Sequence, residues 1–182
     1  MRLGEYQKLV VIKKVEFGVY LAERMENETR VLLPEKQVPE GTKIGDELRV
    51  FLYKDSKDRL IATTNTPKLT LGGLAVLTVK EVGKIGAFLD WGLEKDLFLP
   101  YKEMTVKVQS EDEVLVTLYI DKSRRLCASM KHLYDLLSLE SPYHTGDIVN
   151  GRVYEFSDNF GTFVAVDDQY SAMLPAFEDH SM

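Results

Sequence analysis

One short pattern occurs three times along this chain of 182 residues and constrains the fold more than any other feature. Each copy has an aromatic or apolar residue, a glycine, a small or β-branched residue and a second aromatic residue, followed later by Leu-Pro. The copies begin at Phe17, Ile85 and Phe160 and reach their prolines at Pro34, Pro100 and Pro175. A repeat at this distance means that one supersecondary unit is used several times. We therefore expect an array of similar small domains.

The spacing between the copies stays constant over long stretches. From the Leu-Pro onward, the second copy follows the first at an offset of 66 residues, which aligns Asp55 with Asp121 and Arg59 with Arg125. The third copy follows the second at an offset of 75 residues. This agreement predicts three units, at residues 1–68, 69–139 and 140–182.

Almost every segment within a unit has the composition of a β-strand. Strands are expected at residues 9–12, 19–22, 30–33, 48–53 and 59–63 of the first unit, and at 75–81, 87–91, 96–99, 114–120 and 126–129 of the second. Five short strands separated by turn signals predict a small closed barrel of the oligonucleotide/oligosaccharide-binding (OB) type, so the fold class is all-β. The link between the third and fourth strands is expected to close one end of each barrel with a short helix or turn.

The ends of the second and third units differ from the first. Residues 129–139 have leucines at helical spacing, which predicts a short helix at the end of the second unit. In the third unit, Met182 corresponds to Lys107 of the second, so the counterparts of the last two strands are missing. We therefore expect an incomplete third barrel with open strand edges, and a chain that is a fragment of a longer protein.

Composition points to an ordinary folded protein without catalytic chemistry. Hydrophobic residues make up 45% of the chain, and no apolar run is long enough to span a bilayer, so we predict a cytoplasmic protein. The single cysteine, Cys127, aligns with Ile61 and is expected to be a buried apolar thiol. The histidines show no metal-ligand spacing, and no phosphate-binding loop or nucleophile elbow is present. We predict no enzyme, no cofactor and no metal site.

The net charge of −6 conceals a gradient along the chain. Residues 1–68 contain 13 Lys and Arg against 11 Asp and Glu, whereas residues 141–182 contain 1 against 7. An acidic total argues against binding nucleic acid through charge alone. A local basic face with aromatic contacts is still compatible with this composition, and the first unit is the best place for it.

Two segments of the second unit, residues 85–90 and 114–131, resemble an S1 RNA-binding domain. The first unit resembles it nearly throughout, and the third resembles it as far as it extends. The order of the units is similar to that of the conserved virulence factor B family. This resemblance implies tandem S1-type barrels followed by a winged helix, RNA binding and a role in bacterial gene regulation.

The repeated aromatic pattern suits the binding of single-stranded RNA. Aromatic residues three positions apart would face opposite sides of a regular strand, but a glycine between them permits a bulge or bend that brings both rings to one face. Such rings stack on bases, and a nearby arginine can hold a phosphate. In the S1 pattern, such an arginine lies in an Asp-x-x-x-Arg hairpin. The predicted RNA-binding residues are Phe17, Tyr20 and Arg59 in the first unit, Phe88 and Arg125 in the second, and Phe160 and Phe163 in the third.

Each of these features also has a structural explanation. A barrel aromatic is most often a core residue, Ile85 replaces one ring of the second unit, and Trp91 is expected to cap a barrel core. An Asp-x-x-x-Arg pair is by default a surface ion pair. The S1 pattern often has a histidine where this chain has Leu33, Leu99 and Leu174, so a polar contact to nucleic acid is expected to be lost in all three units.

Two other functions therefore stay open. The barrels could be docking or spacer modules of a protein-interaction scaffold, or the chain could be a subunit of an RNA-processing machine. The expected partners are single-stranded RNA, other proteins of RNA metabolism and a second copy of the chain that pairs through the open third unit. Association with a membrane is not expected.

Overall fold

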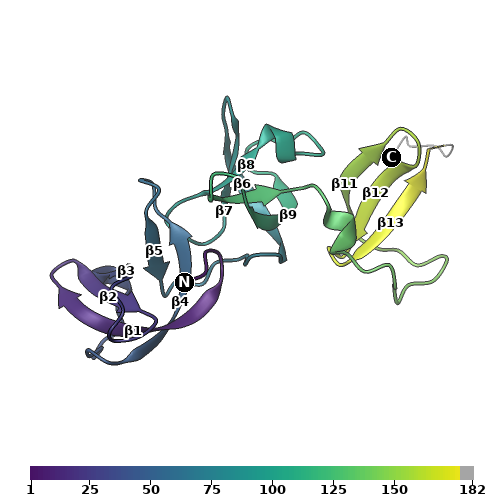
Figure 1. The fold of residues 1–182 in the computed structure, drawn as a ribbon. Helices are drawn as coiled ribbons and strands as arrows, with labels where there is room; N and C mark the ends of the chain where they lie inside the picture. Colours follow the sequence, from purple (N-terminus) through teal and green to yellow (C-terminus); the bar gives the residue numbers. More distant parts are fainter. Residues whose placement is uncertain (177–182) are drawn as a thin grey trace.

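The computed structural model describes residues 1–176, which form three β-sheets arranged in sequence order (Figure 1). The first barrel consists of β1 (Tyr6–Val15), β2 (Gly18–Ala22), β3 (Val31–Pro34), β4 (Glu47–Lys54) and β5 (Leu60–Thr63). Its strand order is β1-β2-β3-β5-β4, and β1 also pairs with β4, so the sheet closes on itself. The parallel pairing of Leu32 with Ile61 joins β3 to β5.

The second barrel repeats this arrangement. It consists of β6 (Leu74–Val82), β7 (Gly86–Asp90), β8 (Leu97–Pro100), β9 (Glu113–Ile120) and β10 (Leu126–Ser129). The order is β10-β9-β6-β7-β8, and β8 lies beside β10, so this barrel is nearly closed. In both barrels the link after the third strand begins with a 3₁₀ turn, η1 (Glu35–Gln37) or η2 (Tyr101–Glu103).

The third sheet is an antiparallel meander of β11 (Gly151–Ser157), β12 (Gly161–Val166) and β13 (Tyr170–Pro175). The sequence prediction of an all-β fold with two five-stranded barrels and an incomplete third one is therefore confirmed. The residue boundaries of the three units stay predictions. The part of the third unit after residue 176 lies outside the described residues.

The short helix predicted over residues 129–139 is reduced to a single 3₁₀ turn, so its predicted extent is wrong. β10 extends to Ser129, and the segment that follows forms one 3₁₀ turn, η3 (Leu133–Asp135). His132 has a φ of 63°, in the left-handed region that a right-handed helix cannot contain. The leucine spacing has another cause, because Leu133 and Leu137 are buried in the cluster that joins the second barrel to the third sheet.

The glycine of the repeat has one structural role in all three sheets. Its φ is 149° at Gly18, 157° at Gly86 and 129° at Gly161, and a Cβ there would lie 2.1, 2.3 and 1.9 Å from a carbonyl oxygen of the next strand. These oxygens belong to Leu33, Leu99 and Leu174, the leucines of the repeated Leu-Pro. Glycine and Leu-Pro therefore recur together because the two backbones approach too closely for any side chain.

The first and second barrels share an apolar joint. Phe51 and Tyr53 of β4 lie in the same buried cluster as the second barrel's core. The ring of Trp91 lies edge-on to both, with centroid distances of 5.8 Å to Phe51 and 6.3 Å to Tyr53, and its Nε1 donates to the carbonyl of Lys95 at 2.6 Å. Trp91 is thus a core residue, as expected, and it also holds the two barrels together.

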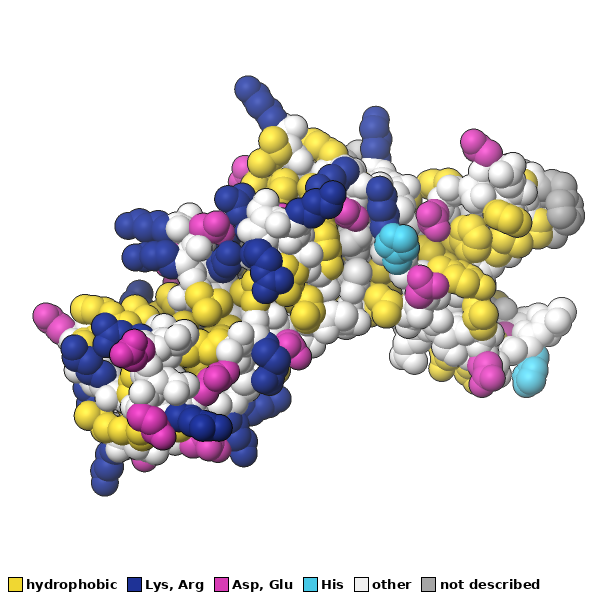
Figure 2. Space-filling model, viewed as in Figure 1, with side chains coloured by type: hydrophobic (Ala, Val, Ile, Leu, Met, Phe, Trp, Pro, Cys, Tyr) yellow, Lys and Arg dark blue, Asp and Glu magenta, His cyan; other side chains and the backbone are white. Residues whose placement is uncertain are grey.

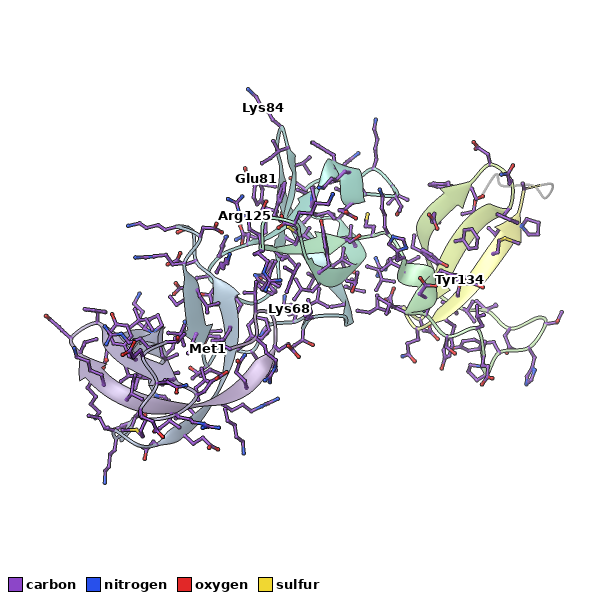
Figure 3. All side chains as sticks on the ribbon, in the orientation of Figure 1. Met1, Lys68, Glu81, Lys84, Arg125 and Tyr134 are labelled. Carbon is purple, nitrogen blue, oxygen red and sulfur yellow. The ribbon has the colours of Figure 1, made fainter. Side chains whose placement is uncertain are left out.

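A second cluster joins the second barrel to the third sheet. Tyr154 of β11 and Ala165 of β12 are buried together with Leu115 of β9 and the leucines around η3. The guanidinium of Arg152 adds a hydrogen bond to the carbonyl of Glu113 at 2.9 Å. Figure 3 shows Tyr134 at this junction.

Candidate nucleic-acid interface

The first barrel brings Phe17 and Tyr20 together on its outer face. Phe17 lies in the turn directly before β2 and is 57% exposed, whereas Tyr20 is half-buried on β2 between two core residues. The ring centroids are 6.3 Å apart, and the rings are nearly perpendicular. The geometry expected from the sequence is therefore present.

The β-bulge that accompanies this pair lies on the neighbouring strand rather than at the glycine. The pairing register shifts between Val11 and Lys13, so that Lys13 lies opposite Tyr20. The same shift lies opposite Phe88 in the second barrel and opposite Phe163 in the third sheet. A bulge increases the local twist of the strand. The three sheets therefore share a β-bulge on their first strand, opposite the aromatic residue of their second strand.

An arginine that the sequence did not indicate lies over Tyr20. The Arg30 guanidinium carbon is 4.2 Å from the centroid of the Tyr20 ring, a cation–π arrangement. Arg30 directly precedes β3, which pairs with β2, and this adjacency follows from the hairpin register. In the sequence, Arg30 was a single cation at the start of the third strand, with nothing to link it to Tyr20.

Arg59, the predicted cation of the first barrel, is held by its own hairpin. Its Nε and Nη2 lie 3.0 and 2.9 Å from Oδ2 of Asp55. Partial burial alone would raise the pKa of Asp55, but the hydrogen bonds that its carboxylate accepts from Arg59 and Lys57 outweigh burial and lower the pKa. Arg59 is exposed and satisfied by Asp55, so a phosphate would have to share it with this carboxylate.

The second barrel has a different pair of rings from the one expected. Phe88 on β7 lies directly opposite Phe98 on β8, with ring centroids 5.4 Å apart. Both rings are half-buried on the outer face, and Ile85 is exposed in the turn beside them. Phe98 therefore supplies the ring that Ile85 does not. Phe98 aligns with Leu32 of the first unit at the offset of 66 residues, and both occupy an outward position of the third strand. Because Leu32 is not aromatic, the repeat did not mark Phe98 as a candidate.

A groove of about 320 Å³ lies between these rings and the first barrel. Its lining includes the rings of Phe88 and Phe98, two cations and three carboxylates: Lys95, Arg125, Asp96, Asp121 and, from the β4–β5 hairpin of the first barrel, Asp58. Figure 3 places Arg125 on the side of the second barrel that faces the first. Asp96 is paired with Lys80, and Asp121 accepts the backbone N–H of Arg125, so these two carboxylates already have partners. The aromatic wall with Lys95 and Arg125 has the components of a single-strand site.

The expected Asp121–Arg125 ion pair does not form in this hairpin. Nε of Arg125 lies 3.3 Å from Oδ1 of Asp58, in the first barrel, whereas Oδ1 of Asp121 accepts the backbone N–H of Arg125 at 2.9 Å. Oδ2 of Asp121 lies 3.7 Å from Sγ of Cys127. Burial raises the pKa of this thiol to about 11, in agreement with its interpretation as an inert core residue.

The third sheet places its two predicted residues in different surroundings. Phe160 is 63% exposed in the turn before β12. Phe163 packs against Tyr154 and Tyr134, with centroid distances of 5.9 and 6.1 Å, in the junction with the second barrel. Phe163 is therefore largely engaged by the protein itself.

The expected loss of a polar contact at Leu174, which is half-buried, stays a prediction, but at Leu33 and Leu99 it is wrong. Both side chains are completely buried inside the barrels. Because side chains alternate along a strand, the outward positions are Leu32 and Phe98, one residue earlier. A histidine at Leu33 or Leu99 would enter the core rather than reach a ligand.

Charge is distributed unevenly over the surface. Figure 2 shows Lys and Arg side chains gathered over the first and second barrels, whereas the third sheet presents mainly acidic and uncharged groups on this face. None of the helical turns within residues 1–176 has the length and apolar character needed to cross a membrane. Among the same residues, no three acidic, cysteine or histidine side chains are grouped as metal ligands.

Comparisons with known proteins identify the units. The S1 domain family model matches residues 3–65 and 71–131. YitL, an uncharacterized protein of Bacillus subtilis, is 29% identical over 179 residues, which cover 92% of this chain and 58% of YitL. Conserved virulence factor B of Staphylococcus aureus is 28% identical over 118 residues, which cover 59% of this chain and 37% of that protein.

A solved structure has the same overall fold. It is a multidomain protein with nucleic acid binding domains from Streptococcus pneumoniae, with a TM-score of 0.72 and 20% identity, and the match covers 98% of this chain and 64% of that one. The chain thus spans less than two thirds of each of these relatives. The resemblance inferred from the sequence is confirmed: the chain belongs to the S1 domain family and is similar to conserved virulence factor B.

Proposed function

We propose that this chain is a non-catalytic, cytoplasmic protein that binds single-stranded RNA through its first and second barrels, in bacterial gene regulation or RNA metabolism. One observation carries the proposal. Each of two adjacent barrels has a pair of aromatic rings on its outer face, Phe17 with Tyr20 and Phe88 with Phe98, and cations lie beside both pairs. The S1 family and the solved relative with nucleic acid binding domains support the same function.

The geometry favours single strands over duplexes. Exposed rings can stack only on bases that are unpaired, and each such contact contributes about 1–3 kcal/mol to binding. The cations next to the rings can contact phosphates, which position the strand without specifying its sequence. Because the net charge is −6, the affinity should depend on stacking as well as on charge.

The groups on this surface are binding groups. Rings and guanidinium groups line it, and the nearby thiol of Cys127 is buried with a pKa raised to about 11, so it is a poor nucleophile at neutral pH. These features are the basis for proposing a binding protein rather than an enzyme.

The test is a fluorescence anisotropy titration with an unstructured RNA of about 12 nucleotides and with the corresponding duplex. We expect salt-dependent binding of the single strand and weaker binding of the duplex. Phe17→Ala should weaken binding several-fold, whereas Ile44→Ala, which removes an equally exposed apolar side chain from the same barrel, should not. The absence of salt-dependent binding to the single strand at low ionic strength would refute the proposal.

The scaffold alternative is favoured at one place, the third sheet. Val153, Phe156 and Met173 are exposed on this small sheet and Phe160 is exposed in the turn before β12, and exposed apolar side chains of this kind often contact another molecule. Affinity purification with and without ribonuclease separates the two functions. Partners that persist after digestion would favour protein docking, and partners that are lost would favour binding through RNA.

A further inference from the structure

Of the three carboxylates that line the groove between the barrels, Asp58 is the one paired with the guanidinium of Arg125. The Asp58 carboxylate lies 3.3 and 3.4 Å from Nε of Arg125, one distance for each oxygen. Beside it, Nζ of Lys95 donates to the backbone carbonyl of Asp55 at 3.1 Å. Both cations of the groove therefore contact oxygen atoms of the β4–β5 hairpin, while Phe88 and Phe98 form the opposite wall.

The hairpin does not need a carboxylate at position 58 for its own fold. Asp58 has a φ of 64° and donates its backbone N–H to the carbonyl of Asp55 at 2.9 Å. The matching residue of the second barrel, Arg124, has a φ of 63° and the same backbone bond to Asp121 at 3.0 Å. The same turn thus forms with an arginine at this position. The acid at 58 makes its side-chain contact across the groove, with the other barrel.

A phosphate is the natural competitor for this carboxylate. Both are oxyanions that accept charge-assisted hydrogen bonds from a guanidinium. The side chains of Arg125 and Asp58 are 59% and 42% exposed, so water and salt screen their attraction and make the pair easy to separate. The barrels would stay joined when it opens, because the buried joint around Trp91 does not involve either residue.

We propose that Arg125 and Lys95 form a phosphate subsite at the barrel junction and that Asp58 occupies it in the free protein as an internal substitute for the RNA phosphate. A bound strand displaces the carboxylate, places its phosphate on Arg125 and stacks a base against Phe88 and Phe98. Asp58 thus lowers the RNA affinity of the second barrel from a position in the first. This inference rests on the proposed RNA-binding function.

The experiment removes the charge of Asp58 and keeps the turn. Asp58→Asn suits this purpose because asparagine also adopts a positive φ. We expect its affinity for the unstructured RNA of about 12 nucleotides to rise about two- to fivefold, since an exposed ion pair contributes little. The slope of log affinity against log salt should steepen by about 0.7, the value for one additional phosphate contact on a single strand.

Two control variants separate this effect from net charge. Glu47→Gln makes the same change in net charge at an exposed residue paired with Lys8, outside the groove, and should leave the affinity close to that of the unmodified chain. Arg125→Gln should lower the affinity, and adding Asp58→Asn to it should bring no gain because the subsite has lost its cation. Thermal unfolding of each variant verifies that the barrels remain folded.

The outcomes distinguish failure of the phosphate subsite from failure of RNA binding. If the unmodified chain binds RNA and Asp58→Asn matches Glu47→Gln or binds more weakly, the phosphate subsite is overturned and the proposed function stands. If neither the unmodified chain nor Asp58→Asn binds RNA, the proposed function fails and the subsite fails with it. A gain that persists in the Arg125→Gln background would also overturn the subsite.

Discussion

Substitution of the repeated glycine by alanine should unfold a barrel locally, and Gly18 is the best position to test this. A Cβ at Gly18 would lie 2.1 Å from the carbonyl oxygen of Leu33, whereas carbon–oxygen contacts in sheets are normally about 3.3 Å or longer. Strand β3 would have to move roughly 1 Å away from β2, and the hydrogen bonds between these strands would lengthen or break. Each buried backbone group left without a partner costs about 1–3 kcal/mol.

A control variant measures the cost of a positive φ at a glycine where an added side chain meets no clash. Gly41 has a φ of 80°, and nothing lies within 4 Å of a Cβ built there. Gly41→Ala should therefore cost only the left-handed backbone penalty, about 1–2 kcal/mol. Gly18→Ala should cost about 3 kcal/mol or more, because its φ of 149° lies in a region that essentially only glycine adopts and the clash with Leu33 adds to that cost.

Urea denaturation of the two variants measures this difference as a change in the free energy of unfolding. The loss for Gly18→Ala should exceed that for Gly41→Ala by about 2 kcal/mol. Equal losses in the two variants would show that the close approach of β2 and β3 is not what the repeated glycine preserves.

Three further predictions follow from the same structure. Phe98→Ala should weaken RNA binding about as much as Phe88→Ala, because each ring forms half of one stacking surface; an unchanged affinity in anisotropy titrations would remove Phe98 from the site. Amides of β11–β13 should exchange with deuterium faster than those of β6–β10, because within residues 1–176 this sheet has three strands and only the single bridge from Ser138 covers the outer edge of β13; equal protection would contradict this. Burial raises the pKa of Cys127 from 9.0 to about 11, so the thiol of the folded chain should react with Ellman's reagent at pH 8 much more slowly than the thiol of the urea-unfolded chain. The stability that the protonated thiol contributes should be lost as the pH rises from about 9 to about 11. Rapid reaction of the folded chain would refute the buried placement.

The repeat made the barrels predictable because its residues meet in space. Gly18 and the Leu33-Pro34 step are separated in sequence, but each requires the other where β2 and β3 approach, so the pattern carries tertiary information. The failed helix at residues 129–139 shows the opposite case. There, Leu133 and Leu137 have helical spacing because they fill a cluster between two sheets, and the left-handed His132 interrupts any helix.

Only part of the candidate site could be predicted from the sequence. Phe17 and Tyr20 were found because one local pattern contains both, whereas Phe98 was missed because it becomes a partner of Phe88 only when β7 and β8 pair. The contact between Asp58 and Arg125 depends on how the two barrels are joined, and no spacing within one unit encodes it. Alignment within the repeat instead indicated Asp121 as the partner of Arg125.

The most direct test of the account is an NMR titration of the ¹⁵N-labelled chain with unstructured single-stranded RNA of about 12 nucleotides. We expect the chemical-shift changes to concentrate on β2–β3 around Phe17 and Tyr20, and on β7–β8 and the Arg125 hairpin. Shift changes confined to the third sheet, or no changes at low salt, would contradict the claim that the paired rings of the first two barrels form the RNA-binding surface.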